Sequence, residues 1–403
     1  MTQDLNSPAG TGRYFPLARG LTKLGHQVTI VALHSNFEAL EQREVQMDGV
    51  NVRYLAPMHV RKRGNQKFYY PTYQLLPLIV RATWALSHAA LTTPADIIHV
   101  GKPHPMNIIA GLLAKTLQGR VLVVDFDDLE SANNRFSGTW QRVVVSFFEK
   151  LGLRCANHIT THTTVLRNYI TELGIPTSNI TMLRHGVDRE RFTAPSAAQL
   201  ESLRSRLALT GKKVVLFVGS MSLVSHAVDT LVAAFACIRN QVPNAILVLV
   251  GGGEDYHTIQ AQVAKLHLGD AIHLCGRVSA AEAALYYHLA DVSVDPIRDN
   301  PAGRASISLK MFETWAAGAP LVTVDVGDRR DLLGTPPAGL LVPPDDSEAL
   351  ARAIINIIQS PETIALLRER SQARAGDFDW MTLSQQIAEM YTALLHSTAT
   401  GRG

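Results

Sequence analysis

Three acidic side chains stand close together at Asp125-Phe126-Asp127-Asp128, directly after the apolar run 121–124. Acidic residues beside a buried strand are rarely there for packing, because burying a charge is costly. Carboxylates in this position can orient substrate hydroxyls, act as a general base, or bind a divalent cation. We take Asp127 and Asp128 as the candidate catalytic residues and leave those roles open. No further acidic or histidine cluster completes a metal site in the sequence, so we expect no metal.

Two glycine-rich loops follow successive apolar runs in the second half of the chain. Backbone amides in such loops can approach an anionic group at the positive end of the next helix. Side by side, the two loops would form a cradle for a diphosphate. The candidate contacts are Gly219, Ser220, Gly251 and Gly253.

A third loop, Gly10-Thr11-Gly12-Arg13, precedes a helix-like stretch near the start of the chain. Gly10, Gly12 and Arg13 are candidates for contact with an acceptor or a phosphate, and a plain turn fits the pattern as well. The fingerprint of a dinucleotide site is not met, because the third glycine and the acidic residue after the next strand are absent. We therefore expect no cofactor.

The most informative segment is Ser308-Leu309-Lys310-Met311-Phe312-Glu313. It follows a strand-like run and a polar loop, and it enters a helix near Ser306. Residues three apart share a helix face, so Lys310 and Glu313 lie together. A carboxylate can accept two hydrogen bonds from a vicinal diol such as a ribose, and a lysine can meet a phosphate. An ordinary surface ion pair fits the spacing equally well.

The elements that must position these residues alternate between short apolar strands and helical patterns. Strands are expected at 27–33, 50–54, 96–100, 120–124, 158–161, 213–218, 246–250, 271–274, 292–295, 321–324 and 339–342. Helices are expected between them, including 12–25, 68–93, 104–117, 139–156 and 163–173. This alternation predicts βαβ units on parallel sheets, and 403 residues suit two domains. The predicted fold class is α/β, with two doubly wound, Rossmann-like domains.

The expected division follows the interruption of this pattern around Pro195. It gives a first domain at 1–188, a linker at 189–210, a second domain at 211–378, and a last helix with a tail at 379–403. A doubly wound domain opens with a strand, yet this chain opens at the loop that follows it. We therefore expect a truncated first strand, with residues 2–5 as its stub, and a true N-terminus upstream of Met1.

The bulk composition excludes several classes of protein. With 46% hydrophobic and 18% charged residues, the chain is globular rather than disordered or fibrous. No apolar run reaches the roughly 18 residues of a membrane span, and the start lacks the features of a signal peptide. The three cysteines are too few and too scattered for a disulfide framework, which favours a reducing, cytoplasmic location.

The first half of the chain is more basic than the second. Residues 1–190 hold 20 Lys and Arg against 14 Asp and Glu, and the remainder holds 18 against 21. The densest basic spot precedes four aromatic residues, a combination that suits an anionic membrane or a lipid-linked acceptor. A solvated loop leading into a helix is the alternative. The residues expected at the inner face of the membrane are Arg61, Lys62, Arg63 and Lys67. We expect no nucleic acid partner.

Several passages together resemble family-4 glycosyltransferases with the GT-B fold. In chain order they are 10–13, Gly25-His26-Gln27-Val28, His185-Gly186-Val187-Asp188, Val250-Gly251-Gly252-Gly253, Cys275-Gly276-Arg277-Val278, 308–313, Ala316-Ala317-Gly318-Ala319-Pro320 and Phe378-Asp379-Trp380. Any one match is weak, but the ordered set covers nearly the whole chain.

The resemblance implies a UDP-, GDP- or ADP-sugar donor on the second domain and a saccharide or lipid-linked acceptor on the first, across a cleft. The last helix would cross back to the first domain. Glu313 would hold the ribose hydroxyls, and Arg277 and Val278 would lie at the base. Lys310 and the glycine loops would serve the diphosphate, and Ser308 and His226 are further candidate donor-binding residues. No metal is implied, because a helix N-terminus and cations can neutralise the leaving phosphate. Members of the family retain the anomeric configuration, with the donor's phosphate assisting the acceptor.

The chain also departs from the family pattern. Ser220 and His226 stand where an arginine and a lysine are common, Ala305 replaces an acid, and Asp127 replaces a histidine. Losing two cations would cost transition-state stabilisation on the order of several kcal/mol unless another group substitutes. The candidate substitutes are His226, Arg298 and Arg304.

The sequence therefore predicts a retaining, metal-independent glycosyltransferase of the hexosyl type that acts on a cell-envelope or exopolysaccharide acceptor. The acceptor is lipid-linked if the basic stretch faces a membrane. One alternative is a catalytically degenerate member that binds a sugar nucleotide or a partner enzyme without turnover, which the absent cations favour. Another is a sugar-nucleotide epimerase on the same fold.

Overall fold

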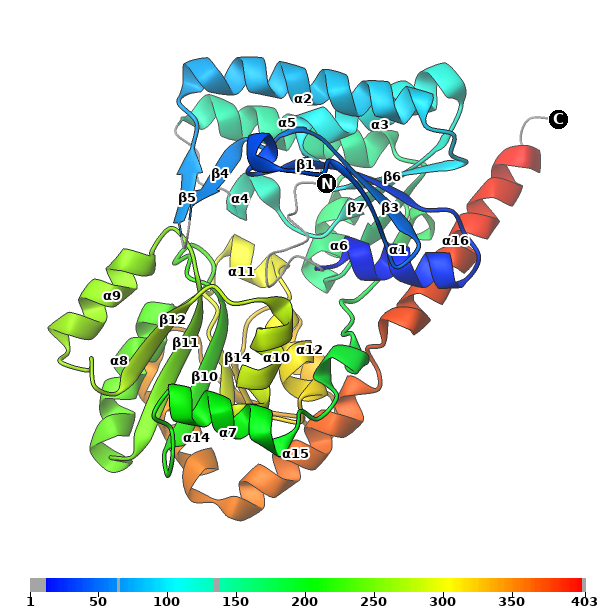
Figure 1. Cartoon of the computed structure of the whole chain (residues 1–403). Helices are drawn as coiled ribbons and strands as arrows, with labels where there is room; N and C mark the ends of the chain where they lie inside the picture. The colour runs from blue at the N-terminus through cyan, green and yellow to red at the C-terminus, as the bar shows by residue number, and fades with distance from the viewer. Residues whose placement is uncertain (1–11, 64–65, 134–137, 401–403) are drawn as a thin grey trace.

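The computed structural model describes residues 12–63, 66–133 and 138–400, which form two α/β domains, one above the other (Figure 1). The expected stub at residues 2–5 and Gly10 lie outside the described residues. The helices of the first domain are α1 Tyr14–Lys23, η1 Phe37–Ala39, α2 Thr72–Thr92, α3 Pro105–Gln118, α4 Glu130–Asn133, α5 Thr139–Cys155, α6 Thr164–Glu172 and η2 Thr177–Asn179. Its strands are β1 Thr29–His34, β2 Glu44–Met47, β3 Val50–Pro57, β4 Val60–Arg63, β5 Gln66–Tyr69, β6 Ile97–Gly101, β7 Val121–Phe126, β8 His158–Thr161 and β9 Ile180–Met182.

The described strands of the first domain form three sheets. Strands β6, β7, β8 and β9 make a parallel sheet in that order, and β1 pairs with β3, which also pairs with the antiparallel β2. Strands β4 and β5 form a separate antiparallel hairpin. The parallel units confirm the predicted fold class. The helix expected at 68–93 begins only at Thr72, because Tyr69 still pairs with Val60 in the hairpin.

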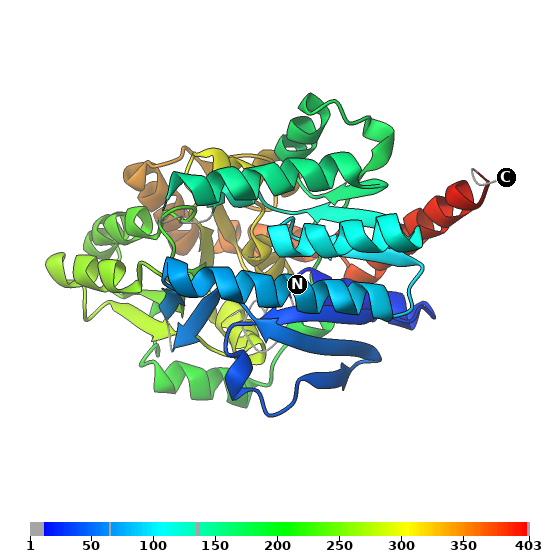
Figure 2. The same ribbon diagram turned by 90° about the horizontal axis from the view of Figure 1, so that it is seen from above.

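Helices α2, α3 and α5 form one layer over the first domain. Helices α3 and α5 each join neighbouring parallel strands, and such crossovers are right-handed, so both helices cover the same face of the sheet. Figure 2 shows α2, α3 and α5 side by side, with α3 in the middle. Their inner faces are packed, since Ala82, Leu86, Ile108 and Leu153 are all buried.

The second domain is built on one parallel sheet of order β12-β11-β10-β13-β14-β15. Its helices are η3 Arg189–Phe192, α7 Ala197–Arg206, α8 Val228–Gln241, α9 Tyr256–Lys265, α10 Ala280–Leu289, α11 Pro301–Ala305, α12 Leu309–Ala316, α13 Arg329–Leu333, α14 Ser347–Gln359 and α15 Pro361–Ala375, and the last helix of the chain is α16 Trp380–Thr400. Its strands are β10 Lys213–Ser220, β11 Ala245–Gly252, β12 Ile272–Gly276, β13 Val292–Asp295, β14 Leu321–Val324 and β15 Leu340–Val342. The chain proceeds outward from β10 to β12 and then returns to β13 on the other side. Ligands bind in open α/β sheets at such a reversal, beyond the carboxyl ends of the two central strands.

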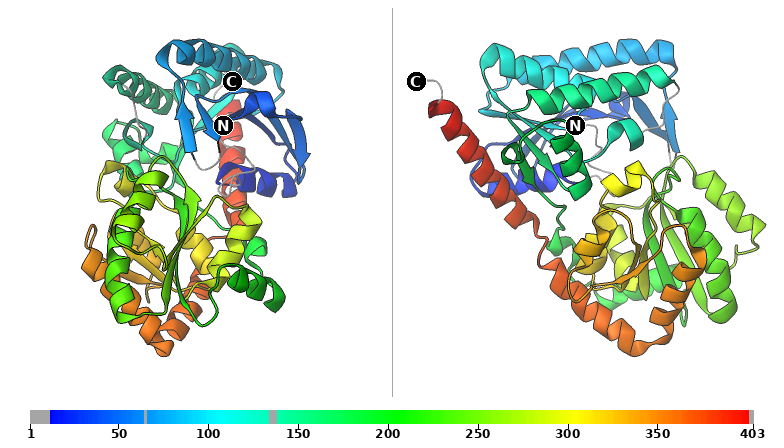
Figure 3. Two further views of the ribbon diagram at one scale, coloured as in Figure 1. Left: turned by 60° about the vertical axis from the view of Figure 1, so that its left-hand side comes forward. Right: turned by 180° about the vertical axis from the view of Figure 1, so that it is seen from behind.

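The chain crosses between the domains twice, and the two crossings lie side by side. The N–H of Val187 donates to the carbonyl of Phe378 at 2.9 Å, and Val187 pairs with Asp379 in an isolated bridge. Helix α16 then runs along the first domain (Figure 3), where Trp380 and Ile387 pack with Leu17 of α1. The predicted helix that crosses back to the first domain is confirmed.

The two domains also touch through α6 and the segments around α11 and α13. The hydroxyl of Thr163 donates to the carbonyl of Ala305 at 3.3 Å, and the N–H of Thr164 donates to Asp328 at 2.8 Å. Ala305 is 1% exposed and packs into the core of the first domain. The position where the related family has an acid therefore serves here as an interdomain packing contact.

Candidate active site

Three residues that were predicted to bind the nucleotide-sugar donor lie together at the reversal point of the second sheet. Gly219 is the next-to-last residue of β10, His226 lies in the loop that follows this strand, and Lys310 lies in the first turn of α12. A Cβ placed on Gly219 would lie 3.1 Å from Cε of Lys310. The Nζ of Lys310 is 3.5 Å from Nδ1 of His226. Glycine at position 219 thus leaves room for the lysine side chain, and the three residues form one cluster.

Two residues that the sequence analysis did not identify hold Lys310 in place. Nζ of Lys310 lies 3.1 Å from Oδ1 of Asp295, and Nε of Arg329 lies 2.9 Å from the other carboxylate oxygen. Asp295 and Arg329 are fully buried, and Lys310 is 4% exposed. Burial raises the pKa of Asp295, but the two cations more than offset this and hold that pKa below its ordinary value. The three side chains carry one net positive charge, which suits an anionic ligand.

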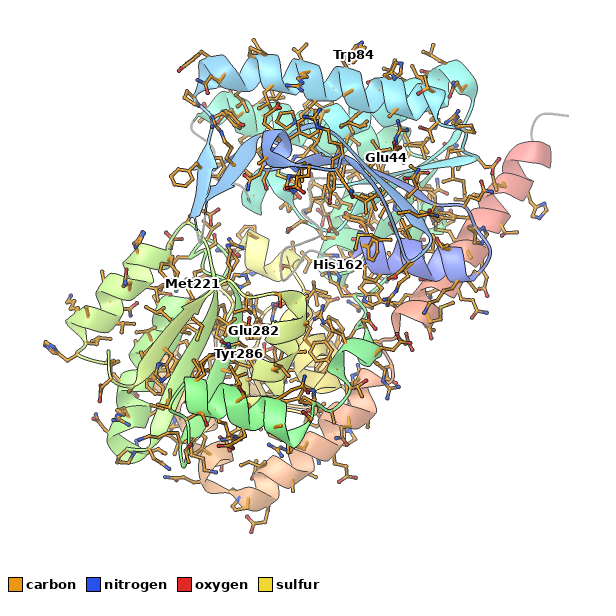
Figure 4. All side chains as sticks on the ribbon, in the orientation of Figure 1. Glu44, Trp84, His162, Met221, Glu282 and Tyr286 are labelled. Atoms are coloured by element: carbon orange, nitrogen blue, oxygen red, sulfur yellow. The ribbon has the colours of Figure 1, made fainter. Side chains whose placement is uncertain are left out.

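The two loops predicted to bind the diphosphate are adjacent. Steric contacts between them require glycine at positions 251 and 253. A Cβ on Gly251, whose φ is 132°, would lie 1.9 Å from the carbonyl oxygen of Gly219, and one on Gly253 would lie 2.5 Å from that of Met221. Figure 4 shows Met221 at the end of the sheet that faces the first domain. Ser220 is half-buried beside Gly252. The glycines let the two loops pack together, and phosphate contact stays a prediction.

Glu313 lies one turn after Lys310 on α12, as its spacing predicts. Its Oε2 accepts a hydrogen bond from the hydroxyl of Tyr287 at 2.9 Å, and Arg191 from η3 pairs with Oε1. The side chain of Glu313 is 16% exposed. A ribose would therefore share this carboxylate with two protein donors that the sequence did not reveal.

The helix around Glu313 differs slightly from the prediction. Instead of one helix from Ser306, the structure has the short α11, a break, and α12 with Ser308 as its N-cap residue. Arg277 and Val278, expected at the base, follow β12 and are half-buried. Their contact with a base stays a prediction.

In the first domain, Asp127 and Asp128 surround Lys102. The Nζ of Lys102 lies 3.5 Å from Oδ1 of Asp127, 3.9 Å from Oδ2 of Asp128 and 2.6 Å from Oε1 of Glu130. Burial raises the pKa of Asp127, although the charge of Lys102 opposes this shift. A carboxyl group with a raised pKa is better suited to exchange protons near neutral pH.

The third acid of this loop, Asp125, is bound to Arg13. Nε of Arg13 lies 2.9 Å from Oδ2 of Asp125, and Nη2 lies 3.1 Å from Oδ1. The remaining Nη1 donates to the carbonyl of Arg184 at 3.2 Å. In this structure the guanidinium is directed into the protein interior. The predicted phosphate role of Gly12 and Arg13 stays a prediction.

Two histidines lie between the acidic loop and α12. The rings of His162 and His185 are 4.5 Å apart between centroids, and His185 is 6.3 Å from the ring of Phe312. Burial lowers both pKa values, that of His185 to about 3, so both rings are neutral. Within the described part of the chain, no group hydrogen-bonds Nδ1 of either ring. Figure 4 shows His162 at the edge of the first domain that faces the second.

The arginines considered as substitutes for the missing cations are paired with acids. Arg298 contacts Asp229, and Nε of Arg304 lies 2.5 Å from Oδ1 of Asp299. Of the three suggested substitutes, His226 is the one placed beside Lys310. The positive charge at the reversal point thus comes from Lys310 and Arg329.

The basic stretch lies on the β4–β5 hairpin rather than in a loop. Arg61, Lys62 and Arg63 belong to β4, and Lys67 belongs to β5. The hydroxyl of Tyr69, also on β5, donates to Oε1 of Glu254 at 3.2 Å. The hairpin therefore reaches from the first domain to the glycine loop of the second.

In the described residues, no three His, Cys, Asp or Glu side chains gather as a metal site requires.

Both halves of the chain are similar to known protein families. Residues 9–186 match the family described as a glycosyl transferase 4-like domain, and residues 212–360 match glycosyl transferases group 1. The glycogen synthase of Mycobacterium tuberculosis is 29% identical over 244 residues, which are 60% of this chain and 55% of that protein. The GDP-mannose-dependent alpha-(1-6)-phosphatidylinositol monomannoside mannosyltransferase of the same organism is 28% identical over 217 residues, or 53% and 56% of the two chains. The chain thus spans about half the length of these curated relatives.

Solved structures resemble the chain over nearly its whole length. HepE of Anabaena, in complex with UDP and glucose, has a TM-score of 0.72 at 20% identity, and the match covers 97% of this chain and 98% of HepE. At this level of identity the likeness shows the fold. Residues 9–186 are therefore similar to glycosyl transferase 4-like domains and residues 212–360 to glycosyl transferases group 1, and the chain has the GT-B fold.

Proposed function

We propose that this protein transfers a sugar from a nucleotide-sugar donor to a cell-envelope or exopolysaccharide acceptor, with retention of the anomeric configuration. The observation that carries the proposal is the cluster at the reversal point, where Lys310 is buried beside Gly219 and Glu313 follows one turn later. This arrangement offers a cation to a diphosphate and a carboxylate to a ribose diol. The division into domains at 1–188 and 211–378 belongs to this proposal.

In the proposed reaction, each domain supplies a different part of the chemistry. Lys310 stabilises the negative charge that develops on the leaving diphosphate, with the helix N-terminus of α12 assisting. The acceptor oxygen bonds to the anomeric carbon as the bond from that carbon to the diphosphate breaks, and the donor's own phosphate assists by accepting a hydrogen bond from the attacking hydroxyl. Asp127 and Asp128 orient the reacting hydroxyls, and Asp127 takes up the proton that the acceptor hydroxyl loses.

The relatives support the donor class and suggest an acceptor. HepE binds UDP and glucose, and the mycobacterial mannosyltransferase is named for GDP-mannose and a phosphatidylinositol acceptor. A lipid-linked acceptor would place the enzyme on the cytoplasmic face of a membrane, with Arg61, Lys62, Arg63 and Lys67 near anionic headgroups.

Thermal-shift screening against UDP-, GDP- and ADP-sugars tests the donor. A ligand that binds only the folded state raises the free energy of unfolding with the logarithm of its saturation, so the matching nucleotide should stand out. Donor hydrolysis and transfer to saccharide acceptors should then follow with that nucleotide. If no nucleotide raises the melting temperature, the donor site is wrong.

A second candidate is a degenerate protein that binds a sugar nucleotide or a partner enzyme without turnover. It is favoured by Ser220 and His226 in place of two cations, and by the pairing of Arg298 and Arg304 with acids. Tight UDP or GDP binding with neither hydrolysis nor transfer would support this candidate over the enzyme.

A further inference from the structure

Exposed apolar side chains concentrate on two helices of the first domain. Of the 17 large hydrophobic side chains that are exposed among the described residues, eight lie on α2 and α5. Those on α2 are Tyr73, Leu76, Val80 and Trp84, and those on α5 are Trp140, Val143, Val144 and Phe147. Monomeric proteins seldom leave so many large apolar groups together in water without a binding partner. We call these eight residues the α2–α5 face.

The two helices present these residues on the outer side of one layer. On each helix the exposed residues recur at spacings of three and four, which places them on a single stripe. Helices α2, α3 and α5 lie side by side over the sheet (Figure 2), and the inner stripe of α2, including Ala82 and Leu86, is buried against the domain core. Figure 4 shows Trp84 pointing away from the body of the protein.

The charges on this layer are almost all positive. Helices α2, α3 and α5 carry five basic residues, which are Arg81, Lys115, Arg142, Lys150 and Arg154. Their one acid, Glu149, is fully buried and contributes no exposed negative charge. Arg81 is paired with the exposed Glu38 of η1, so the excess of exposed positive charge lies on α5. An apolar stripe flanked by basic residues and rich in tryptophan is complementary to the interface of an anionic bilayer. Two copies of such a face would repel each other.

Helix α2 is also the segment that comes nearest to a membrane span. By length and composition, Tyr73–Thr92 is long and apolar enough to cross a bilayer, with a mean hydropathy of 1.2. Its inner stripe, however, is packed into the core, so the helix can lie along a membrane but cannot be surrounded by lipid without unfolding the layer.

We propose that the α2–α5 face docks on an anionic phospholipid membrane, with Trp84 and Trp140 in the interfacial region and the helix axes parallel to the bilayer. The β4–β5 hairpin, which directly precedes α2, would then lead from the membrane to the second domain through the contact of Tyr69 with Glu254. A lipid-linked acceptor could enter along this route. The delivery of such an acceptor rests on the proposed function, whereas the docking itself does not.

Tryptophan fluorescence gives a direct test, because the chain has four tryptophans and Trp315 and Trp380 are buried. The full chain is mixed with vesicles of phosphatidylcholine alone or with 30% phosphatidylglycerol, in the absence of donor and acceptor (~30% is a typical anionic content, chosen to give a negative surface). With anionic vesicles, the emission should shift to the blue, and brominated lipid should quench it. Trp84→Phe and Trp140→Phe should each remove part of the quenched signal.

Flotation measures the binding itself. Replacing Leu76, Val80, Trp84, Val143 and Phe147 with Gln should lower partition onto anionic vesicles at least tenfold (an estimate on the order of that for removing several buried apolar side chains). The matched control is Leu366→Gln, which removes an exposed apolar residue from α15 of the second domain and should bind as the wild type does. The nucleotide-induced thermal shift confirms that each variant is folded and separates failure of docking from failure of the donor site.

Three results would overturn the proposal. In the first, the wild type binds none of the vesicles. In the second, the Gln variant floats as well as the wild type does. In the third, the wild type is a dimer in solution and the Gln variant is a monomer. The third result would assign the face to a second copy of the chain.

An Arg142→Gln, Lys150→Gln variant should weaken binding to anionic vesicles several-fold and remove most of its salt dependence.

Discussion

Lys310 and Asp295 form an ion pair from which solvent is almost excluded, with Nζ and Oδ1 3.1 Å apart. Asp295 ends strand β13 and Lys310 lies in the first turn of helix α12, so the pair fixes the helix to the sheet at the reversal point. Arg329 shares the same carboxylate. Removing one member of a buried pair leaves an uncompensated charge, which typically costs about 3–5 kcal/mol. The pair therefore both stabilises the second domain and orients the cation that we assign to the diphosphate.

This shared carboxylate predicts opposite outcomes for two substitutions. Lys310→Met leaves Asp295 neutralised by Arg329, so the fold should persist while sugar transfer falls by about 100-fold or more. Asp295→Asn leaves two buried cations and should lower the free energy of unfolding by about 3–5 kcal/mol. Urea unfolding and steady-state kinetics measure the two effects. Wild-type transfer by Lys310→Met would remove the lysine from the mechanism.

The position of Glu313 predicts a selective loss of donor binding. Glu313→Gln should weaken nucleotide binding and lower activity severely while leaving the fold intact, because a neutral amide accepts hydrogen bonds from a ribose less strongly. Tyr287→Phe is the matched control, since it removes a neighbour of the carboxylate and keeps the carboxylate itself. Calorimetric titration with nucleotide compares the two. Near-normal activity of Glu313→Gln would count strongly against the assigned contact.

The raised pKa of Asp127 predicts a pH dependence. If Asp127 accepts a proton, the rate should rise with pH through a pKa above the ordinary value for aspartate of about 3.9. Asp127→Asn should lower the rate and abolish this acidic limb of the profile. Asp128→Asn should leave the limb in place. The profile of kcat/KM for the three proteins decides the point, and an unchanged limb in Asp127→Asn would assign the proton acceptor elsewhere.

Burial of Glu149 predicts how stability depends on pH. Burial raises its pKa from 4.5 to about 7. In the unfolded chain the group therefore loses its proton at lower pH than in the folded protein, so the free energy of unfolding falls as pH rises from about 4.5 to 7.

Glu149→Gln removes this loss while its side-chain oxygen can still accept the hydrogen bond from the N–H of Ser131. The variant should match the wild type near pH 4 and exceed it by up to about 3 kcal/mol at pH 8. Glu348→Gln, at an exposed position, is the control for loss of one negative charge. Thermal melts across this range measure the difference, and parallel curves for wild type and Glu149→Gln would contradict the assignment.

The basic residues of the β4–β5 hairpin are expected to contribute to membrane binding independently of the α2–α5 face. Replacing Arg61, Lys62, Arg63 and Lys67 with Ser should reduce flotation with anionic vesicles, since each basic residue near the surface contributes about 1 kcal/mol. Donor hydrolysis without vesicles should remain. Unchanged flotation would restrict membrane contact to the helices.

Local patterns predicted much of the fold and part of the site. Alternating apolar runs located every strand of the second domain's sheet and β6, β7 and β8 of the first domain's parallel sheet, but they missed the short edge strand β9. The spacing of Lys310 and Glu313 placed them on one helix. The partners of these residues come from distant parts of the chain, as Arg191 does for Glu313, so no spacing pattern could reveal them. Nor does the composition of the basic stretch distinguish a loop from the hairpin formed there, because only cross-strand pairing does so.

Placing the two chain crossings against each other has a mechanical consequence. Two separated connections would act as struts and fix the domains, whereas the bonded pair at Val187 and Asp379 acts as a single hinge. Rotation about this hinge preserves the bond between Val187 and Phe378, but it must break the interdomain contacts of Thr163 with Ala305 and of Thr164 with Asp328. The distance from Asp127 on the first domain to Lys310 on the second can therefore change only when those contacts open. Substrates that bind both domains would select between the two arrangements.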